Sequence, residues 1–146
     1  MIRYKRRLRM KDLEIFMLFK EGTSMGYLII EDTKRTLNSA EKQLLPFKIM
    51  DEDELEEYKN LIKIYILADE ELSKDDKSIF EEFAMDLVDE KDYCAYILES
   101  YVDEQFFYDS PVDLEVEDYE KMLKIVNSSY DISKLDLKNL SYLSQE

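Results

Sequence analysis

Both glycines of this 146-residue chain, Gly22 and Gly26, lie in one short break between two apolar segments. Before the break, residues 13–20 alternate between two faces, and after it residues 27–30 form a second apolar run. This pattern predicts an antiparallel hairpin over residues 12–31. Because the chain holds only two glycines and two prolines, it allows few sharp turns, which favours helices and other regular elements over a loop-rich all-β fold.

The segment after the hairpin carries weaker signals. Asn38 or Ser39 is expected to cap a short helix that ends before Pro46, and residues 47–50 are expected to form a third strand. Residues 61–68 can be read in two ways, because their apolar spacing continues a helical stripe while their β-branched residues are also typical of a strand. We interpret this stretch as a helix.

The clearest helix signal follows Ser73 or Ser78, either of which can cap it. Residues 79–88 place apolar side chains at i, i+3 and i+4 spacing and turn acidic side chains outward. The apolar and tyrosine positions of residues 93–101 predict that this helix continues or restarts. Residues 119–126 predict another amphipathic helix.

These signals together predict an α+β fold, in which an N-terminal antiparallel hairpin or small sheet packs against an acidic, mainly helical C-terminal half. Residues 133–136 resemble a capping box and predict a short terminal helix. The length favours one domain, residues 1–146. Its three regions are a basic tip over residues 1–11, the hairpin and sheet region over residues 12–50, and the acidic region over residues 51–146.

The charge of the chain is concentrated in residues 51–120, which hold 26 acids and five lysines. Residues 1–11 hold six bases and no acid, and the whole chain carries −15. Negative charge repels nucleic acid and anionic membranes, both of which attract cations. We therefore expect a basic protein as partner, with no direct binding of nucleic acid or membrane by the acidic body. The basic tip can contact nucleic acid or fold back on that body, and Met10 is a second candidate start.

The sequence carries no signature of a catalytic or cofactor site. Histidine is absent, which removes the commonest general base and most catalytic zinc sites. Two glycines cannot supply a phosphate-binding loop, and Cys94 has acids and aromatics for sequence neighbours, which do not activate a thiol. We expect no catalytic residue, no metal and no cofactor. The single cysteine and the lack of a long apolar segment predict a cytoplasmic protein.

The strongest functional candidate is the stretch of residues 92–120, which interleaves acids with aromatics and contains no lysine or arginine. Carboxylates on a rigid frame can imitate the phosphates of DNA, and half-exposed aromatics can anchor an interface. The ordinary alternative is that helices turn these acids to water and these aromatics to the core. The predicted partner-binding residues are Tyr101, Asp103, Glu104, Phe106, Tyr108, Asp109, Asp113, Glu115, Glu117, Asp118 and Glu120.

Three functions compete on this evidence. The first is a non-enzymatic inhibitor that occludes the basic nucleic-acid-binding surface of its partner. In composition the chain is similar to the small acidic anti-defence proteins of phages and mobile elements, such as anti-restriction and anti-CRISPR proteins that act as DNA mimics. The alternative is an immunity protein that neutralises a toxic nuclease or another effector. A second alternative is a small carboxylate-dependent hydrolase or metal nuclease.

Overall fold

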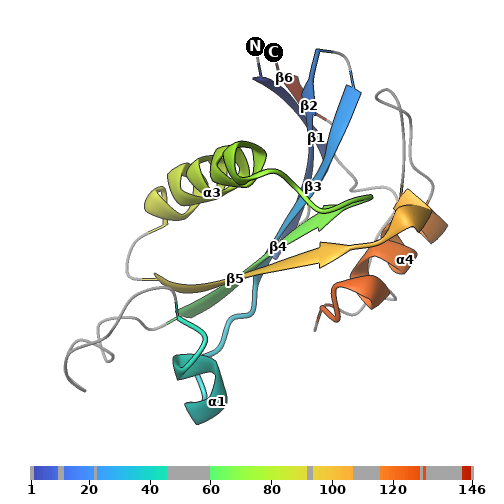
Figure 1. The fold of residues 1–146 in the computed structure, drawn as a ribbon. Helices are drawn as coiled ribbons and strands as arrows, with labels where there is room; N and C mark the ends of the chain where they lie inside the picture. The colour runs from blue at the N-terminus through green and yellow to red at the C-terminus, as the bar shows by residue number, and fades with distance from the viewer. Residues whose placement is uncertain are drawn as a thin grey trace.

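The computed structural model describes residues 2–9, 12–21, 23–45, 60–91, 94–106, 116–128, 130 and 143–145. In this part of the chain, helices accompany one mixed sheet of six strands in the order β5-β4-β3-β2-β1-β6, which is an α+β arrangement (Figure 1). The strands are β1 (Ile2–Arg9), β2 (Leu13–Lys20), β3 (Thr23–Asp32), β4 (Asn60–Ala68), β5 (Cys94–Val102) and β6 (Leu143–Gln145). The helices are α1 (Ser39–Lys42), α3 (Lys74–Asp89), η1 (Glu104–Phe106) and α4 (Val116–Ile125).

Strands β2 and β3 pair in antiparallel register, from Leu13 opposite Glu31 to Lys20 opposite Thr23. The register shifts next to Gly26, whose φ of +139° lies in a region that side chains disfavour. A Cβ atom at this position would lie 2.6 Å from the carbonyl oxygen of Leu67 on β4. Glycine is therefore required here for two reasons, the backbone conformation and the close approach of the neighbouring strand.

The helix interpretation of residues 61–68 is wrong, because these residues form most of β4. This strand pairs with β3 in antiparallel and with β5 in parallel orientation, so it lies inside the sheet. Both of its faces are covered: Ile64 packs on the α3 side and Tyr65 on the α4 side. A strand buried on both faces shows no alternation in its sequence, which is why the pattern also fitted a helix.

The predicted helical continuation over residues 93–101 is also wrong, since residues 94–102 form β5. Its pairing with β4 supplies hydrogen bonds along the whole strand, from Asn60 opposite Cys94 to Ala68 opposite Val102. The mainly helical character of the acidic half is accordingly not confirmed. Instead, β4, α3 and β5 form a crossover unit in which the helix joins two parallel strands.

Helices α3 and α4 cover opposite faces of the sheet (Figure 1). The apolar stripe of α3 buries Phe80, Ala84 and Val88 against one face. On the other face, α4 contributes Tyr119 and Met122 to a second core cluster. Both helices occur where the sequence predicted them, and no helix in the described ranges is long and apolar enough to cross a membrane.

The basic tip contributes a strand to the sheet. Residues 2–9 form β1, which pairs with β2 on one side and β6 on the other. The predicted cap of α1 is confirmed at Asn38, whose side chain accepts a hydrogen bond from the Glu41 backbone N–H at 2.9 Å. The predicted strand over residues 47–50 and the terminal helix from residue 133 lie outside the described residues.

Candidate interaction surface

The outward face of α3 presents a row of carboxylates to solvent. Six acids and two lysines occur within its 16 residues. Ser73 caps the helix by accepting a hydrogen bond from the Asp76 backbone N–H at 3.2 Å. Glu82, Asp86 and Glu90 are exposed and follow one another at i, i+4 spacing, so they lie on one side of the helix about 6 Å apart along its axis.

Asp86 and Glu90 lie at the end of α3 where the helix dipole disfavours negative charge. The last turn of α3 contains no basic residue, although the negative end of a helix dipole favours cations and repels anions. Among the described residues, the ion pair found on α3 joins Lys20 to Asp76 at 3.8 Å, near the opposite end. Asp86 and Glu90 are therefore placed against the dipole, and the three acids Glu82, Asp86 and Glu90 repel one another without a salt bridge in the described part of the chain.

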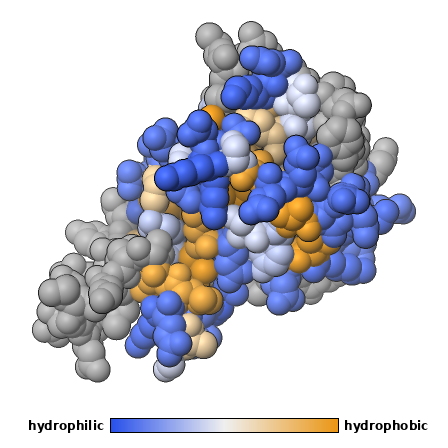
Figure 2. Space-filling view, in the orientation of Figure 1, coloured by the Kyte–Doolittle hydropathy of each residue, from blue (hydrophilic) through white to orange (hydrophobic). Residues whose placement is uncertain are grey.

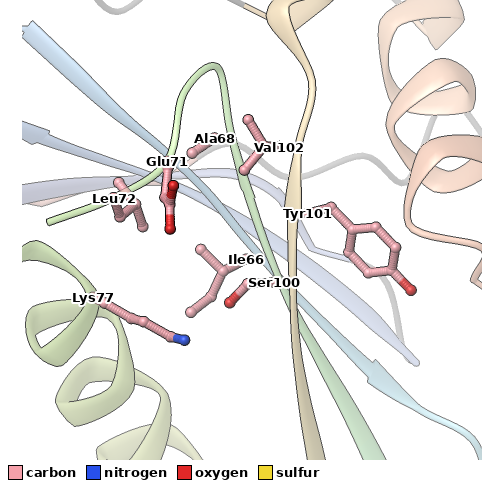
Figure 3. A pocket seen from close by; sticks show the side chains of 8 residues that line it. All are labelled: Ile66, Ala68, Glu71, Leu72, Lys77, Ser100, Tyr101 and Val102. Carbon is pink, nitrogen blue, oxygen red and sulfur yellow. The ribbon is translucent and has the colours of Figure 1, made fainter. Parts of the chain in front are cut away.

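A pocket of about 380 Å³ opens between the first turns of α3 and the C-terminal ends of β4 and β5 (Figure 3). Its lining residues are Ile66, Ala68, Glu71, Leu72, Lys77, Ser100, Tyr101 and Val102. Figure 3 shows apolar side chains on its floor, with the Lys77 amine and the Glu71 carboxylate at its side. The Asp103 backbone N–H donates to the Ala68 carbonyl oxygen at 2.8 Å, which fixes the two strand ends next to each other.

The predicted anchor Tyr101 is partly buried on the α4 side of the sheet, and Figure 3 shows its ring turned away from the pocket. Its ring centroid lies 6.1 Å from that of Tyr65. The Tyr101 hydroxyl donates to Glu99 Oε2 at 2.6 Å. Burial raises the pKa of Tyr101 to about 12, and the hydrogen bond to Glu99 adds to this effect. Tyr101 is thus a packing residue more than an exposed contact.

The other predicted contact residues divide between two places. Asp103 and Glu104 follow β5 directly, and the Asp103 carboxylate accepts a hydrogen bond from the Gln105 backbone N–H at 2.9 Å. Glu117, Asp118 and Glu120 lie on α4. The Phe106 side chain and the residues Tyr108, Asp109, Asp113 and Glu115 lie outside the description.

The acids on α4 have an ordinary structural explanation. Glu117 and Asp118 occupy the first turn, which is the positive end of the helix dipole. Glu120 forms an i, i+4 ion pair with Lys124, whose Nζ lies 3.2 Å from its carboxylate. Among the described residues, Glu82, Asp86 and Glu90 have neither a first-turn position nor an ion-pair partner, in contrast to Asp75 and Asp76 on α3 and to the acids of α4.

A polar network lies at the N-terminal end of β4. The Arg35 guanidinium donates to both carboxylate oxygens of Glu41 at 2.5 Å, and Lys63 Nζ lies 3.6 Å from the same group. The Arg35 hydrogen bonds lower the pKa of Glu41 to about 2. Ser128 donates to the buried Glu31 carboxylate. These contacts connect α1 and the end of α4 to the sheet. Within the described ranges no group of three acidic or cysteine side chains is arranged to hold a metal ion.

Sequence reasoning did not single out the α3 row or the pocket as a site. The row could have been found from the i, i+4 spacing of Glu82, Asp86 and Glu90 along a predicted helix. The pocket could not, because Leu72 and Val102 are brought together only by the parallel pairing of β4 with β5.

Comparison with protein-family models, with curated proteins and with solved structures found no match. The assignment of function therefore depends on the geometry and charge of the described residues.

Proposed function

We propose that this chain is a non-enzymatic, acidic inhibitor that acts in the cytoplasm by occupying the nucleic-acid-binding surface of a basic partner protein. The outward face of α3 is its main contact surface, and the partner meets carboxylates where it would otherwise meet phosphates. The observation that carries the proposal is the exposed row Glu82, Asp86 and Glu90, which runs from the middle of α3 to its C-terminal end, where negative charge is least favourable.

Unfavourable local placement supports a functional role for this row. Like charges at i, i+4 destabilise a helix by about 0.2–0.5 kcal/mol per pair, and the pairs Glu82–Asp86 and Asp86–Glu90 both belong to this class. Natural proteins depart from local rules mainly at functional sites. Because α4 follows the dipole rule in the same protein, the departure on α3 is specific to that helix.

The linear charge density of α3 is within a factor of two of a DNA strand. Its 16 residues span about 24 Å and carry a net charge of −4, which is roughly one charge per 6 Å. A single DNA strand carries one charge per about 3.4 Å. A groove that binds phosphates would therefore meet a rigid but sparser row of anions, and association would be fast and sensitive to salt.

The test is capture of proteins from a nuclease-treated host lysate on the immobilised full chain. The expected result is a basic nucleic-acid-binding protein that is retained at low salt, is released at high salt, and is displaced by added duplex DNA. Retention of a protein that DNA does not displace would contradict occlusion of a nucleic-acid site.

Two variants with the same change in charge locate the surface. The α3 variant combines Glu82→Gln, Asp86→Asn and Glu90→Gln, and we expect it to lose capture. The matched variant combines Glu104→Gln, Glu117→Gln and Glu120→Gln on the surface predicted from sequence, and we expect it to retain capture. If only the matched variant loses capture, the contact surface is the one after β5 and on α4, and the assignment to α3 is wrong.

The immunity-protein alternative uses the same surface and differs in the identity of the captured partner. A toxic nuclease or other effector would indicate immunity, and a defence enzyme would indicate anti-defence.

The hydrolase or metal-nuclease alternative predicts turnover that ends when one or two specific carboxylates are neutralised. Among the described residues the buried carboxylates are Glu31 and Glu41, so Glu31→Gln and Glu41→Gln are the variants that test it.

A further inference from the structure

In the described part of the chain, β5 is an edge strand of the sheet, and its C-terminal half lies beside the pocket. The sheet order places β5 at one end, paired with β4 alone among the described strands. In its C-terminal half, Ser100 and Val102 are exposed, and Val102 has an exposed fraction of 57%. An edge strand with unpaired backbone groups is a template for pairing with another extended segment.

The pocket lies where the side chains of such an added strand would fall. Ser100 and Val102 point to the α3 side of the sheet and line the pocket together with Ile66 and Leu72. Figure 2 shows hydrophilic surface over α3 and apolar patches along β5 beside it. In strand addition, main-chain hydrogen bonds give affinity, and pockets for alternate side chains give specificity. The groove between α3 and β5 supplies both elements.

The charge around this groove selects the occupant. Asp69, Glu70 and Glu71 follow β4, while Asp103 and Glu104 follow β5. The hydrogen bond from Asp103 to Ala68 brings these two groups to the same end of the sheet. At the other end, burial raises the pKa of Tyr96, and the nearby carboxylates of Asp89 and Glu81 on α3 add to this effect. Lys77 is the cation among the residues that line the pocket, and the acids at the two ends outnumber it. An apolar floor with acids at both ends is complementary to an apolar side chain flanked by lysine or arginine.

We propose that an extended basic segment of the partner pairs with β5 as an additional strand, inserts one apolar side chain into the pocket, and places its cations over the acids at the ends of the groove. This inference rests on the proposed function, because it takes the same basic partner and specifies how that partner is held. A second copy of this chain is disfavoured as occupant, since a net charge of −15 makes two copies repel each other.

The probe is a labelled nine-residue peptide with two lysines at each end and alternating valine and threonine in its centre, and binding to the full chain is followed by fluorescence anisotropy at low ionic strength. Two N-methylated forms carry the methyl groups on the amides of the valines or on the amides of the threonines. Since alternate backbone amides of a strand point to opposite sides, one form should lose affinity by at least about tenfold and the other should bind as the parent does. Equal binding of all three peptides, or no binding, would overturn the proposal.

The protein variant Ser100→Trp fills the pocket from an exposed position and should weaken peptide binding by at least about tenfold. Thr36→Trp, on an exposed loop away from the groove, is the matched control and should leave binding unchanged. Amide hydrogen exchange of the unaltered protein gives a readout without mutation. Residues 99–102 should exchange more slowly when the peptide is bound, and unchanged exchange there would place the peptide elsewhere and refute strand addition.

The two proposals can fail separately. If Ser100→Trp still captures the lysate partner while the α3 charge variant does not, the inhibitor proposal stands and strand addition is wrong. If neither variant affects capture, both are wrong. Sedimentation at increasing protein concentration tests whether a second copy of the chain binds this edge. A dimer that is dissociated by Ser100→Trp would identify the chain itself as the occupant and would overturn the inference of a basic partner.

Discussion

The Arg35 guanidinium binds the Glu41 carboxylate through two hydrogen bonds of 2.5 Å each, and in doing so fastens α1 to the sheet. Glu41 also completes the capping box of α1 by accepting a hydrogen bond from the Asn38 backbone N–H at 3.1 Å. One carboxylate thus serves as helix cap and as partner of two cations, Arg35 and Lys63. The link between the β3–α1 loop and β4 therefore depends on the negative charge of Glu41.

Glu41→Gln should destabilise the fold by about 1–3 kcal/mol, because it leaves Arg35 with a weaker partner while the side chain is almost fully buried. The measurement is the midpoint and slope of urea unfolding at neutral pH. Lys42→Gln, on the exposed side of the same helix, is the control and should change stability little. Equal effects of the two substitutions would show that the ion pair does not hold α1 in place.

The same ion pair predicts how stability depends on pH. The pKa of Glu41 in the folded protein, about 2, lies below its ordinary value of 4.5. A depressed pKa contributes stability that is fully present above the ordinary value and is lost as pH falls toward 2. The difference in unfolding free energy between the unaltered protein and Glu41→Gln should therefore shrink between about pH 4.5 and pH 2. A difference that is constant over this range would contradict the assignment.

Neutralising the α3 row should make the protein more stable even as it removes function. Combining Glu82→Gln, Asp86→Asn and Glu90→Gln relieves two i, i+4 repulsions and should raise the unfolding free energy by roughly 0.4–1 kcal/mol at low salt. Added salt should reduce the gain, because it screens exposed charges. Glu117→Gln on α4 removes a favourable interaction with the helix dipole and should give no gain. A loss of stability in the α3 variant would remove the argument that these acids are kept for binding.

Gly26→Ala should be among the most destabilising single substitutions in the sheet. The added Cβ would lie 2.6 Å from the Leu67 carbonyl oxygen, and the φ of +139° is strained for any residue with a side chain. Backbone strain of this kind costs about 1–3 kcal/mol, with the steric clash in addition. Ser24→Ala on the same strand, with ordinary backbone geometry, is the matched comparison in thermal or urea unfolding. Similar stability of the two variants would show that β3 and β4 separate without cost at this point.

The contact surface predicted from residues 92–120 combines acids and aromatics that have different structural roles in the fold. Residues 92–120 hold acids and aromatics without a base, yet Tyr101 turns toward the core and Glu117 stabilises its own helix. Which acids lack a structural role depends on the direction of each helix and on the cations near them. Neither can be read from composition.

The amino-acid sequence was enough to predict the local elements whose signals lie within a few residues. Periodicity was sufficient for α3 and α4, with a capping serine in addition for α3, because an amphipathic stripe and a capping side chain act within one helix. It also determined the sign and the position of the charge. The three-dimensional arrangement makes residues 61–68 and 94–102 strands, because their conformation depends on neighbours far away in the chain. It likewise decided which acids share a face, and it created the groove between α3 and β5, since parallel pairing alone brings Leu72 next to Val102.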